Sequence, residues 1–462
     1  MADQNPYLEG NFAPWRLEGE AHDLEVIGEI PRDLRGAYYR NGPNPAYEPT
    51  GKYHWFDGDG MIHAVSLRDG RAAYRNRYVL SDGLKEEQTE GKALYPGLLA
   101  LSPSEVPRFK ITGNTNIVAH AGRLLALVEA GLPTEMTPQT LATVGLYDFG
   151  GRLGGPMTAH PKLDPETGEM LFFGYSPFPP YLQYHVVDRA GVLVRSEVID
   201  IPWPSMIHDF AITANEVIFI LCPIVFSFED VKRRGGAFSW EPERGTRIGV
   251  MPRTGGSADV RWFETEACYV FHPMNAYRDD DLLTLDVCRY PELYFMQADR
   301  PRERQFSSDD GARLHRWRLD LGTGSITSTP LDDRNCEFPR IDERLTGRAY
   351  RYGYVAAKGA EADGTTMPVF STLQKHDLER GTCEVRRYPL GNGVGEPLFV
   401  PREGSRAEDD GYVVSLVYDQ TRNASEFVIL DAQALTAEPL ARVLIPHRVP
   451  YGFHGNWVPT TN

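Results

Sequence analysis

Histidine is the residue type in this chain whose placement best suggests chemistry. Twelve histidines are present, and four of them lie beside turns or at the ends of strand-like runs: His160, His208, His272 and His454. Neutral imidazole is a common ligand of iron, zinc, copper and nickel. Taken singly, each is more commonly a surface residue or a hydrogen-bonded core residue. Spacing alone does not select these four, because four histidines can always be chosen from twelve.

The separations between the four histidines still restrict the kind of site they could form. Several dozen residues or more separate each histidine from the next along the chain. These gaps are far too long for a zinc finger or knuckle, whose ligands come from one hairpin or one helical turn. Gaps of this size are compatible with a repeated architecture in which each ligand comes from a different structural unit and all of them meet at a common axis.

Short strand-like runs dominate the chain. The 44 glycines and 35 prolines are spread along its whole length, and between them lie apolar or alternating runs such as 117–120, 170–174, 217–222, 282–287 and 412–418. Turn residues bound most of these runs, whereas helical periodicity is limited to short candidates at 137–141, 229–234 and 291–297. The pattern predicts one all-β domain spanning residues 1–462.

Three all-β architectures fit such strands: a sandwich, a barrel or a propeller. A sandwich or small barrel uses roughly 100–200 residues, whereas a propeller of about seven four-stranded blades can use the whole chain. No tryptophan-aspartate or kelch repeat signature is present, so sequence periodicity alone does not distinguish among the three architectures. The length favours the propeller.

Composition excludes several functional classes. The formal net charge is −16, and the chain has no cluster of lysine and arginine that could bind a nucleic-acid backbone. No apolar stretch approaches the roughly 20 residues of a membrane-spanning helix. The N-terminal residues lack the features of a signal peptide, and the five scattered cysteines are typical of free thiols in a reducing compartment. We therefore expect a cytoplasmic protein that does not bind nucleic acid.

Several motifs in order along nearly the whole chain resemble the carotenoid cleavage oxygenase family. They are Tyr39-Arg-Asn-Gly-Pro-Asn44, Phe56-Asp-Gly-Asp-Gly-Met-Ile-His63, Asn114-Thr-Asn116, His160-Pro-Lys-Leu-Asp-Pro165, Met206-Ile-His-Asp-Phe210, Phe271-His272, Glu337-Phe-Pro339, Gly395-Glu-Pro-Leu-Phe-Val400 and Phe453-His-Gly455. The resemblance implies a seven-bladed β-propeller with long loops capping its top face. It also implies one non-heme Fe(II) on the axis, with His160, His208, His272 and His454 as its ligands.

The resemblance implies further residues around that metal. Glu129, Glu337 and Glu396 match the family's three glutamates, which we expect behind His208, His272 and His454, with no glutamate behind His160. Such carboxylates orient metal-bound imidazoles through their second ring nitrogen. Thr115 matches a residue whose methyl group crowds one open metal position, which leaves one site for dioxygen.

The reaction that the resemblance implies is oxidative cleavage of a carbon–carbon double bond by dioxygen, giving two carbonyl products. The substrates in such a family are carotenoids, apocarotenoids, stilbenes and phenylpropenes. Apolar and aromatic side chains would line a dry tunnel to the metal. The candidates are Phe56, Tyr95, Leu98, Val128 and Phe271.

One departure from the family pattern bears on the substrate. Relatives that cleave phenolic alkenes carry a lysine just before the Glu129 position and a tyrosine upstream; here the corresponding residues are Val128 and Leu98, with Tyr95 nearby. Valine cannot hydrogen-bond a phenolate. The sequence therefore favours an apolar, apocarotenoid-like substrate over stilbenes or phenylpropenes of the isoeugenol type. A non-catalytic metal-binding propeller is a third interpretation.

The segment 94–101 is apolar and rich in turn residues, and it could form a patch at a tunnel mouth. It lacks the flanking lysines and arginines that would bind anionic lipid, and the acidic net charge opposes such binding. We expect at most weak peripheral contact with a membrane.

Overall fold

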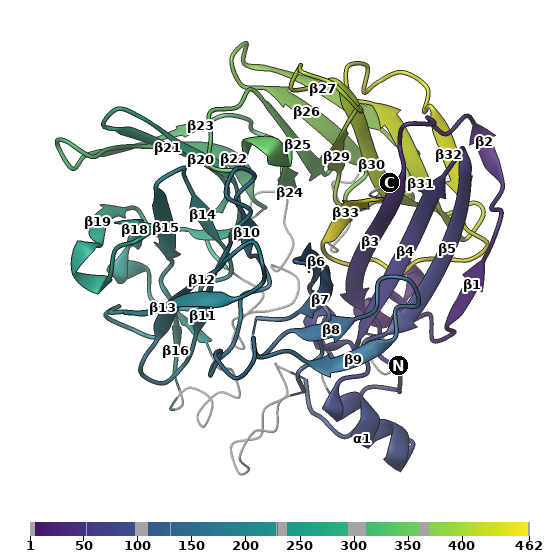
Figure 1. Cartoon of the computed structure of the whole chain (residues 1–462), viewed down its shortest axis with the longest axis horizontal. Coiled ribbons are helices and arrows are strands. Elements are labelled where there is room, and N and C mark those ends of the chain that lie inside the picture. The colour runs from purple at the N-terminus through teal and green to yellow at the C-terminus, as the bar shows by residue number, and fades with distance from the viewer. Residues whose placement is uncertain are drawn as a thin grey trace.

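Seven antiparallel sheets of four to six strands surround a central axis (Figure 1). The computed structural model describes residues 5–51, 53–97, 110–129, 131–227, 229, 238–293, 311–359 and 369–460. The sheets form a seven-bladed β-propeller, with long loops between strands, which confirms the predicted fold class. We number the blades 1 to 7 in chain order.

Each blade is one sheet of four to six strands, which are named from the innermost strand outward. Blade 1 contains β33 (Gly455–Pro459), β3 (Gly36–Pro43), β4 (Gly60–Arg68), β5 (Arg71–Tyr78) and β1 (Gly19–Ala21). Blade 2 contains β6 (Asn116–His120), β7 (Arg123–Leu127), β8 (Thr134–Met136) and β9 (Thr143–Leu146). Blade 3 contains β10 (Lys162–Leu163), β11 (Met170–Tyr175), β12 (Leu182–Val187) and β13 (Leu193–Ile199).

The remaining four blades follow the same plan. Blade 4 contains β14 (Phe210–Ile212), β15 (Glu216–Leu221), β18 (Thr246–Pro252) and β19 (Arg261–Thr265), with the hairpin β16 (Ile224–Phe226) and β17 (Phe238–Trp240) beside it. Blade 5 contains β20 (Tyr269–Asp279), β21 (Leu282–Tyr290), β22 (Arg313–Asp320) and β23 (Ile326–Pro330). Blade 6 contains β24 (Cys336–Arg340), β25 (Tyr352–Ala357), β26 (Thr372–Asp377) and β27 (Thr382–Arg387). Blade 7 contains β28 (Gly393–Val394), β29 (Leu398–Pro401), β30 (Gly411–Asp419), β31 (Ala424–Asp431), β32 (Ala441–Leu444) and β2 (Val26–Gly28).

Both ends of the chain close the ring. β33, close to the C-terminus, pairs with β3 as the innermost strand of blade 1. β2, close to the N-terminus, pairs with β32 as the outermost strand of blade 7. Because each closure joins a strand from one end of the chain to a strand from the other end, opening the ring would cost both sets of ladder hydrogen bonds.

The hydrophobic core lies between neighbouring blades. The cluster between blades 4 and 5 packs Ile218 and Ile248 against Leu285 and Trp317, all with no measurable exposure. Some middle strands, such as β15, are nearly continuous apolar runs because both of their faces are covered. Outer strands alternate instead, as in β13, where only Leu193 and Ile199 at the two ends are buried.

Some local expectations were wrong. The sequence suggested no helix at Asp82–Glu90, where the structure has α1, capped by the Ser81 side chain and ended by left-handed Gly91. The candidate helical turn at 137–141 is an ordinary turn, and most of the candidate at 291–297 lies outside the described residues.

Among the described residues, none of the helices is both long enough and apolar enough to span a bilayer.

Candidate metal centre

Each of the seven blades supplies one residue to a cluster on the propeller axis. The four histidines lie on or just before innermost strands: His160 before β10, His208 before β14, His272 within β20 and His454 before β33. The three glutamates come from the other three blades, with Glu129 after β7, Glu337 in β24 and Glu396 before β29. The innermost strands converge on the axis, which brings together residues far apart in the chain.

The four imidazole rings meet face to edge in one buried group. The Nε2 atoms of His160 and His208 lie 3.0 Å apart, and those of His208 and His272 lie 3.2 Å apart. The His454 ring centroid lies 4.6 Å from that of His160 and 4.8 Å from that of His272. One ligand nitrogen from each ring lies within 4.8 Å of the other three.

This arrangement fits a single metal ion. Two imidazole nitrogens held about 2.1 Å from one ion at a right angle are about 3.0 Å apart, close to the two separations between Nε2 atoms. Burial, followed by the fields of the other histidines, holds the pKa of His160 well below its ordinary value. His160 is therefore neutral near pH 7, which is the form that binds a metal.

Breaks in the strand register direct two of these side chains toward the axis. Between Val270 and Pro273, β20 carries one more residue than its partner strand, and His272 lies within this bulge. A second bulge in β24 separates Glu337 from Arg340 and places Phe338 in the left-handed region at φ +55°. Bulges re-aim side chains, and the prolines at 273 and 339 have no N–H to continue the ladder.

Three histidines each contact one glutamate through the second ring nitrogen. Nδ1 of His208 is in contact with Glu129 Oε1, Nδ1 of His272 lies 2.5 Å from Glu337 Oε2, and Nδ1 of His454 lies 2.9 Å from Glu396 Oε1. Among the described residues, no carboxylate is paired with the His160 ring. The contacts fix both ring orientation and tautomer, and they leave each Nε2 free to bind a metal.

Each glutamate is in turn held by a group that no sequence pattern marks. The Tyr175 hydroxyl donates to Glu129 Oε2 at 2.8 Å. The backbone N–H of Phe338 donates to Glu337 at 2.8 Å, and that of Gly455 donates to Glu396 at 2.9 Å. Arg340 also approaches Glu396 at 3.2 Å. Sequence reasoning missed Tyr175 and Arg340, because their role depends on contacts between blades.

Arg340 determines the charge of Glu396. Burial acts to raise the pKa of this carboxyl, but the Arg340 guanidinium and His454 together lower it to about 2. Glu396 is therefore ionised throughout the physiological pH range. The Arg340 side chain is only 12% exposed, and the two charges compensate each other in a region where neither would be stable alone.

Aromatic side chains cover the histidines. The Phe271 ring lies perpendicular to His208 at 4.8 Å, and Phe338 stacks on His272 at 5.8 Å and meets His454 edge-on at 5.3 Å. Phe56 is half-buried and contacts Phe453, the residue before His454, at 5.6 Å. These rings give the centre an apolar wall.

The other predicted site residues lie in varied settings. Thr115 is half-buried; its carbonyl accepts from the His454 N–H and its hydroxyl donates to Asn114. Val128 is half-buried beside Glu129. Tyr95 is half-buried and donates to Glu86 of α1, whereas Leu98 and the rest of 98–101, the second half of segment 94–101, lie outside the described residues. Their part in a tunnel stays a prediction.

We expect Glu337→Gln to weaken metal binding by about 10- to 100-fold, because glutamine cannot balance the charge of a metal-bound imidazole or hold its N–H as strongly. The measurement is metal affinity by competition with a chelator. Glu426→Gln is the matched control, since Glu426 is an equally buried carboxylate that pairs with Arg442 in blade 7. Equal affinity in the two variants would contradict the role assigned to Glu337.

Comparison with known proteins agrees with this geometry. The family described as "Retinal pigment epithelial membrane protein" matches residues 12–459. A "Carotenoid cleavage oxygenase" of Mycobacterium tuberculosis is 38% identical over 99% of this chain and 98% of its own length. The crystal structure of Pseudomonas brassicacearum lignostilbene dioxygenase superposes with a TM-score of 0.92 and 34% identity, covering 99% of both chains. The crystal structure of cobalt-substituted Synechocystis apocarotenoid oxygenase superposes with a TM-score of 0.86 and 32% identity, covering 97% of both chains.

These similarities extend over nearly the whole chain, and the matched range 12–459 spans all seven blades. The chain therefore belongs to the family of the retinal pigment epithelial membrane protein and the carotenoid cleavage oxygenases.

Proposed function

We propose that this protein is an Fe(II)-dependent oxygenase that uses dioxygen to cleave a carbon–carbon double bond of an apolar conjugated alkene. The observation that carries the proposal is the convergence of four imidazoles on one point, with three of them backed by glutamates. Family membership supports an alkene-cleaving enzyme. The reaction balances without another reductant, since both atoms of dioxygen are accounted for by the two carbonyl products.

We propose iron as the metal because the reaction requires activation of dioxygen and because of the family to which the chain belongs. Imidazole ligands alone would also suit zinc, copper or nickel. A ferrous ion held by four neutral histidines would supply the electrons that activate dioxygen, and four protein ligands would leave coordination positions open for that purpose. His160, His208, His272 and His454 would hold the ion, and the carboxylates would offset its charge.

The remaining work of the protein is positioning and exclusion of water. Phe271 and Phe338 pack on the histidines, and Phe56 packs on Phe453, the residue before His454. An alkene held against such a wall meets the reacting centre in a fixed orientation, which is a substantial part of catalysis. No side-chain acid or base is required, and we assign none. Thr115 is proposed to restrict access to one side of the metal.

We infer an apocarotenoid-like substrate from the residue before Glu129. Val128 offers no donor to a phenolate, so a long apolar polyene suits this part of the site better. The alternative is a hydroxystilbene or phenylpropene, and the likeness to lignostilbene dioxygenase favours it. Incubation of the Fe(II)-loaded protein with an apocarotenal and with a hydroxystilbene, followed by mass spectrometry of products, separates the two. Conversion of the phenolic compound alone would overturn the preference.

Val128→Lys is expected to shift selectivity toward phenolic alkenes by at least about tenfold in the ratio of kcat/KM values, because an ammonium can pair with a phenolate that valine leaves unpaired. Val128→Leu is the matched control and should keep the original ratio. Steady-state kinetics with both substrates provide the measurement. An unchanged ratio in the lysine variant would show that residue 128 does not face the substrate.

Location and membrane contact are proposed from composition. The scattered cysteines support a cytoplasmic protein, and the acidic charge supports at most weak peripheral contact with a membrane.

A further inference from the structure

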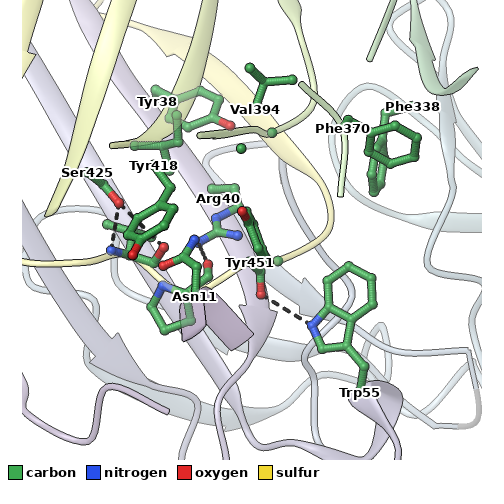
Figure 2. Close-up of a pocket in the computed structure, with 16 residues that line it drawn as sticks. Asn11, Tyr38, Arg40, Trp55, Phe338, Phe370, Val394, Tyr418, Ser425 and Tyr451 are labelled. Atoms are coloured by element: carbon green, nitrogen blue, oxygen red, sulfur yellow. Dashed lines mark hydrogen bonds between the residues drawn. The ribbon is translucent and has the colours of Figure 1, made fainter. Parts of the chain in front are cut away.

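A small cavity lies beside the metal centre, between blades 1 and 7 (Figure 2). Its volume is about 30 Å³, whereas one water needs only about 10–15 Å³. Phe338, whose ring packs on His272 and His454, lines one part of it. Arg40 of β3 is among the other lining residues, together with Ser425, Tyr418 and Tyr451.

Arg40 is a buried cation with few partners. The residue is only 5% exposed. A guanidinium has five N–H donors, yet among the described residues a single hydrogen bond is formed, from Nη2 to the Pro450 carbonyl at 2.7 Å. The Arg40 Nε is buried and has no hydrogen-bond partner in this part of the chain. Within the described ranges, no carboxylate pairs with Arg40.

This setting differs from that of comparable arginines in the same protein. Arg340 and Arg316, whose side chains are each 12% exposed, both have carboxylate partners. Arg340 is paired with Glu396, and Arg316 is paired with Asp286 through two hydrogen bonds of 2.8 Å. Burying a charge is costly unless a counter-charge and hydrogen bonds compensate it. Although the chain has 64 acidic residues, none of those that the structure describes pairs with Arg40, whose donors remain unused beside a cavity.

We propose that Arg40 and this cavity form a binding site for one small monovalent anion, of the size of chloride or bicarbonate. The unused guanidinium N–H groups would donate to the anion, and its charge would balance that of Arg40. A single small ion fits a cavity of about 30 Å³. The site is separate from the four histidines, and the proposal does not depend on the reaction that the protein catalyses.

Arg40 also contacts the segment that precedes His454. Arg40 donates to Pro450, and its guanidinium lies against Gly452, where a Cβ atom would collide with Nη1. The neighbouring Asn41 brackets the same segment through backbone hydrogen bonds with Phe453 and His454, of 3.0 and 2.9 Å. An anion that fixes Arg40 would therefore stiffen the approach to His454.

Crystals grown in bromide in place of chloride test the proposal directly on the full chain. We expect an anomalous bromide peak in the cavity, within hydrogen-bond distance of the Arg40 guanidinium and displaced by excess bicarbonate if that anion is preferred. Water alone in the cavity, with bromide only at exposed lysines and arginines, would overturn the proposal.

Thermal unfolding at constant ionic strength gives an independent measurement. Replacing gluconate, which is too large for the cavity, with chloride or bicarbonate should raise Tm by roughly 1–2 °C per tenfold increase in anion concentration above Kd. Arg40→Met should abolish this dependence, and Val394→Phe, which fills the cavity and retains the arginine, should do the same if the methionine variant does not fold. Arg402→Met, at a half-exposed arginine paired with Asp410, is the control. An identical anion response in the wild type and the cavity variants would contradict the assignment.

Discussion

Replacing His208 with alanine is expected to abolish alkene cleavage and to leave less than about 1% of the bound metal, because loss of a ligand should exceed the 10- to 100-fold cost of losing an outer partner. The effect should be severe at this position in particular, since His208 Nε2 lies within 3.2 Å of the Nε2 atoms of both His160 and His272. Metal content per chain and product formation are the two measurements.

His185→Ala is the matched control for that experiment. His185 is also buried in a blade, where its Nδ1 lies 2.8 Å from the Ser196 hydroxyl and its ring stacks on Phe172. This variant should lose stability but retain one metal ion per folded chain. If His208→Ala kept its metal while His185→Ala lost it, the ligand assignment would be wrong.

Removal of the metal is the second change with a large expected effect. Treatment with a strong chelator should eliminate activity and lower Tm, because an ion that binds only the folded protein stabilises it by mass action. Adding Fe(II) back under anaerobic conditions should restore both properties once dioxygen is admitted. Zinc should restore Tm without activity, since it fits imidazole ligands but has no redox chemistry.

Comparing zinc with iron distinguishes metal binding at the four-histidine site from the redox chemistry of the bound metal. Activity restored equally by zinc would contradict the oxygenase mechanism, although it would leave the four-histidine site intact. A Tm that responds to neither ion would contradict the site itself.

Much of the architecture could be predicted from local patterns. Strand-length apolar runs and evenly distributed turn residues pointed to an all-β chain, and the length pointed to a propeller. Helix α1 was missed because its buried side chains are only Leu84 and Glu87, so almost no apolar stripe marks it.

The histidine cluster shows why spacing alone was insufficient. The gap from His160 to His208 and the gap from His208 to His272 each correspond to one blade, and the second is longer because of the hairpin and loops added to blade 4. The much longer gap from His272 to His454 passes through blades 6 and 7, which supply Glu337 and Glu396 instead. Motif resemblance identified these residues, whereas no periodicity in the chain could have done so.

The groups that support the site could not be predicted at all. Tyr175 and Arg340 act through glutamates that lie in other blades, and Phe338 occupies a backbone conformation that bulky residues rarely adopt. These features depend on how the innermost strands meet. Arg40 lies within a matched motif, but only the structure reveals that no carboxylate among the described residues accompanies it.

The central claim is that four imidazoles from separate blades bind one iron ion. The most direct measurement is anomalous diffraction from the protein purified without added metal, with data collected on both sides of the iron absorption edge. A single iron peak within bonding distance of His160, His208, His272 and His454 is the predicted result. Absence of iron from that point, or an iron peak elsewhere in the molecule, would contradict the account.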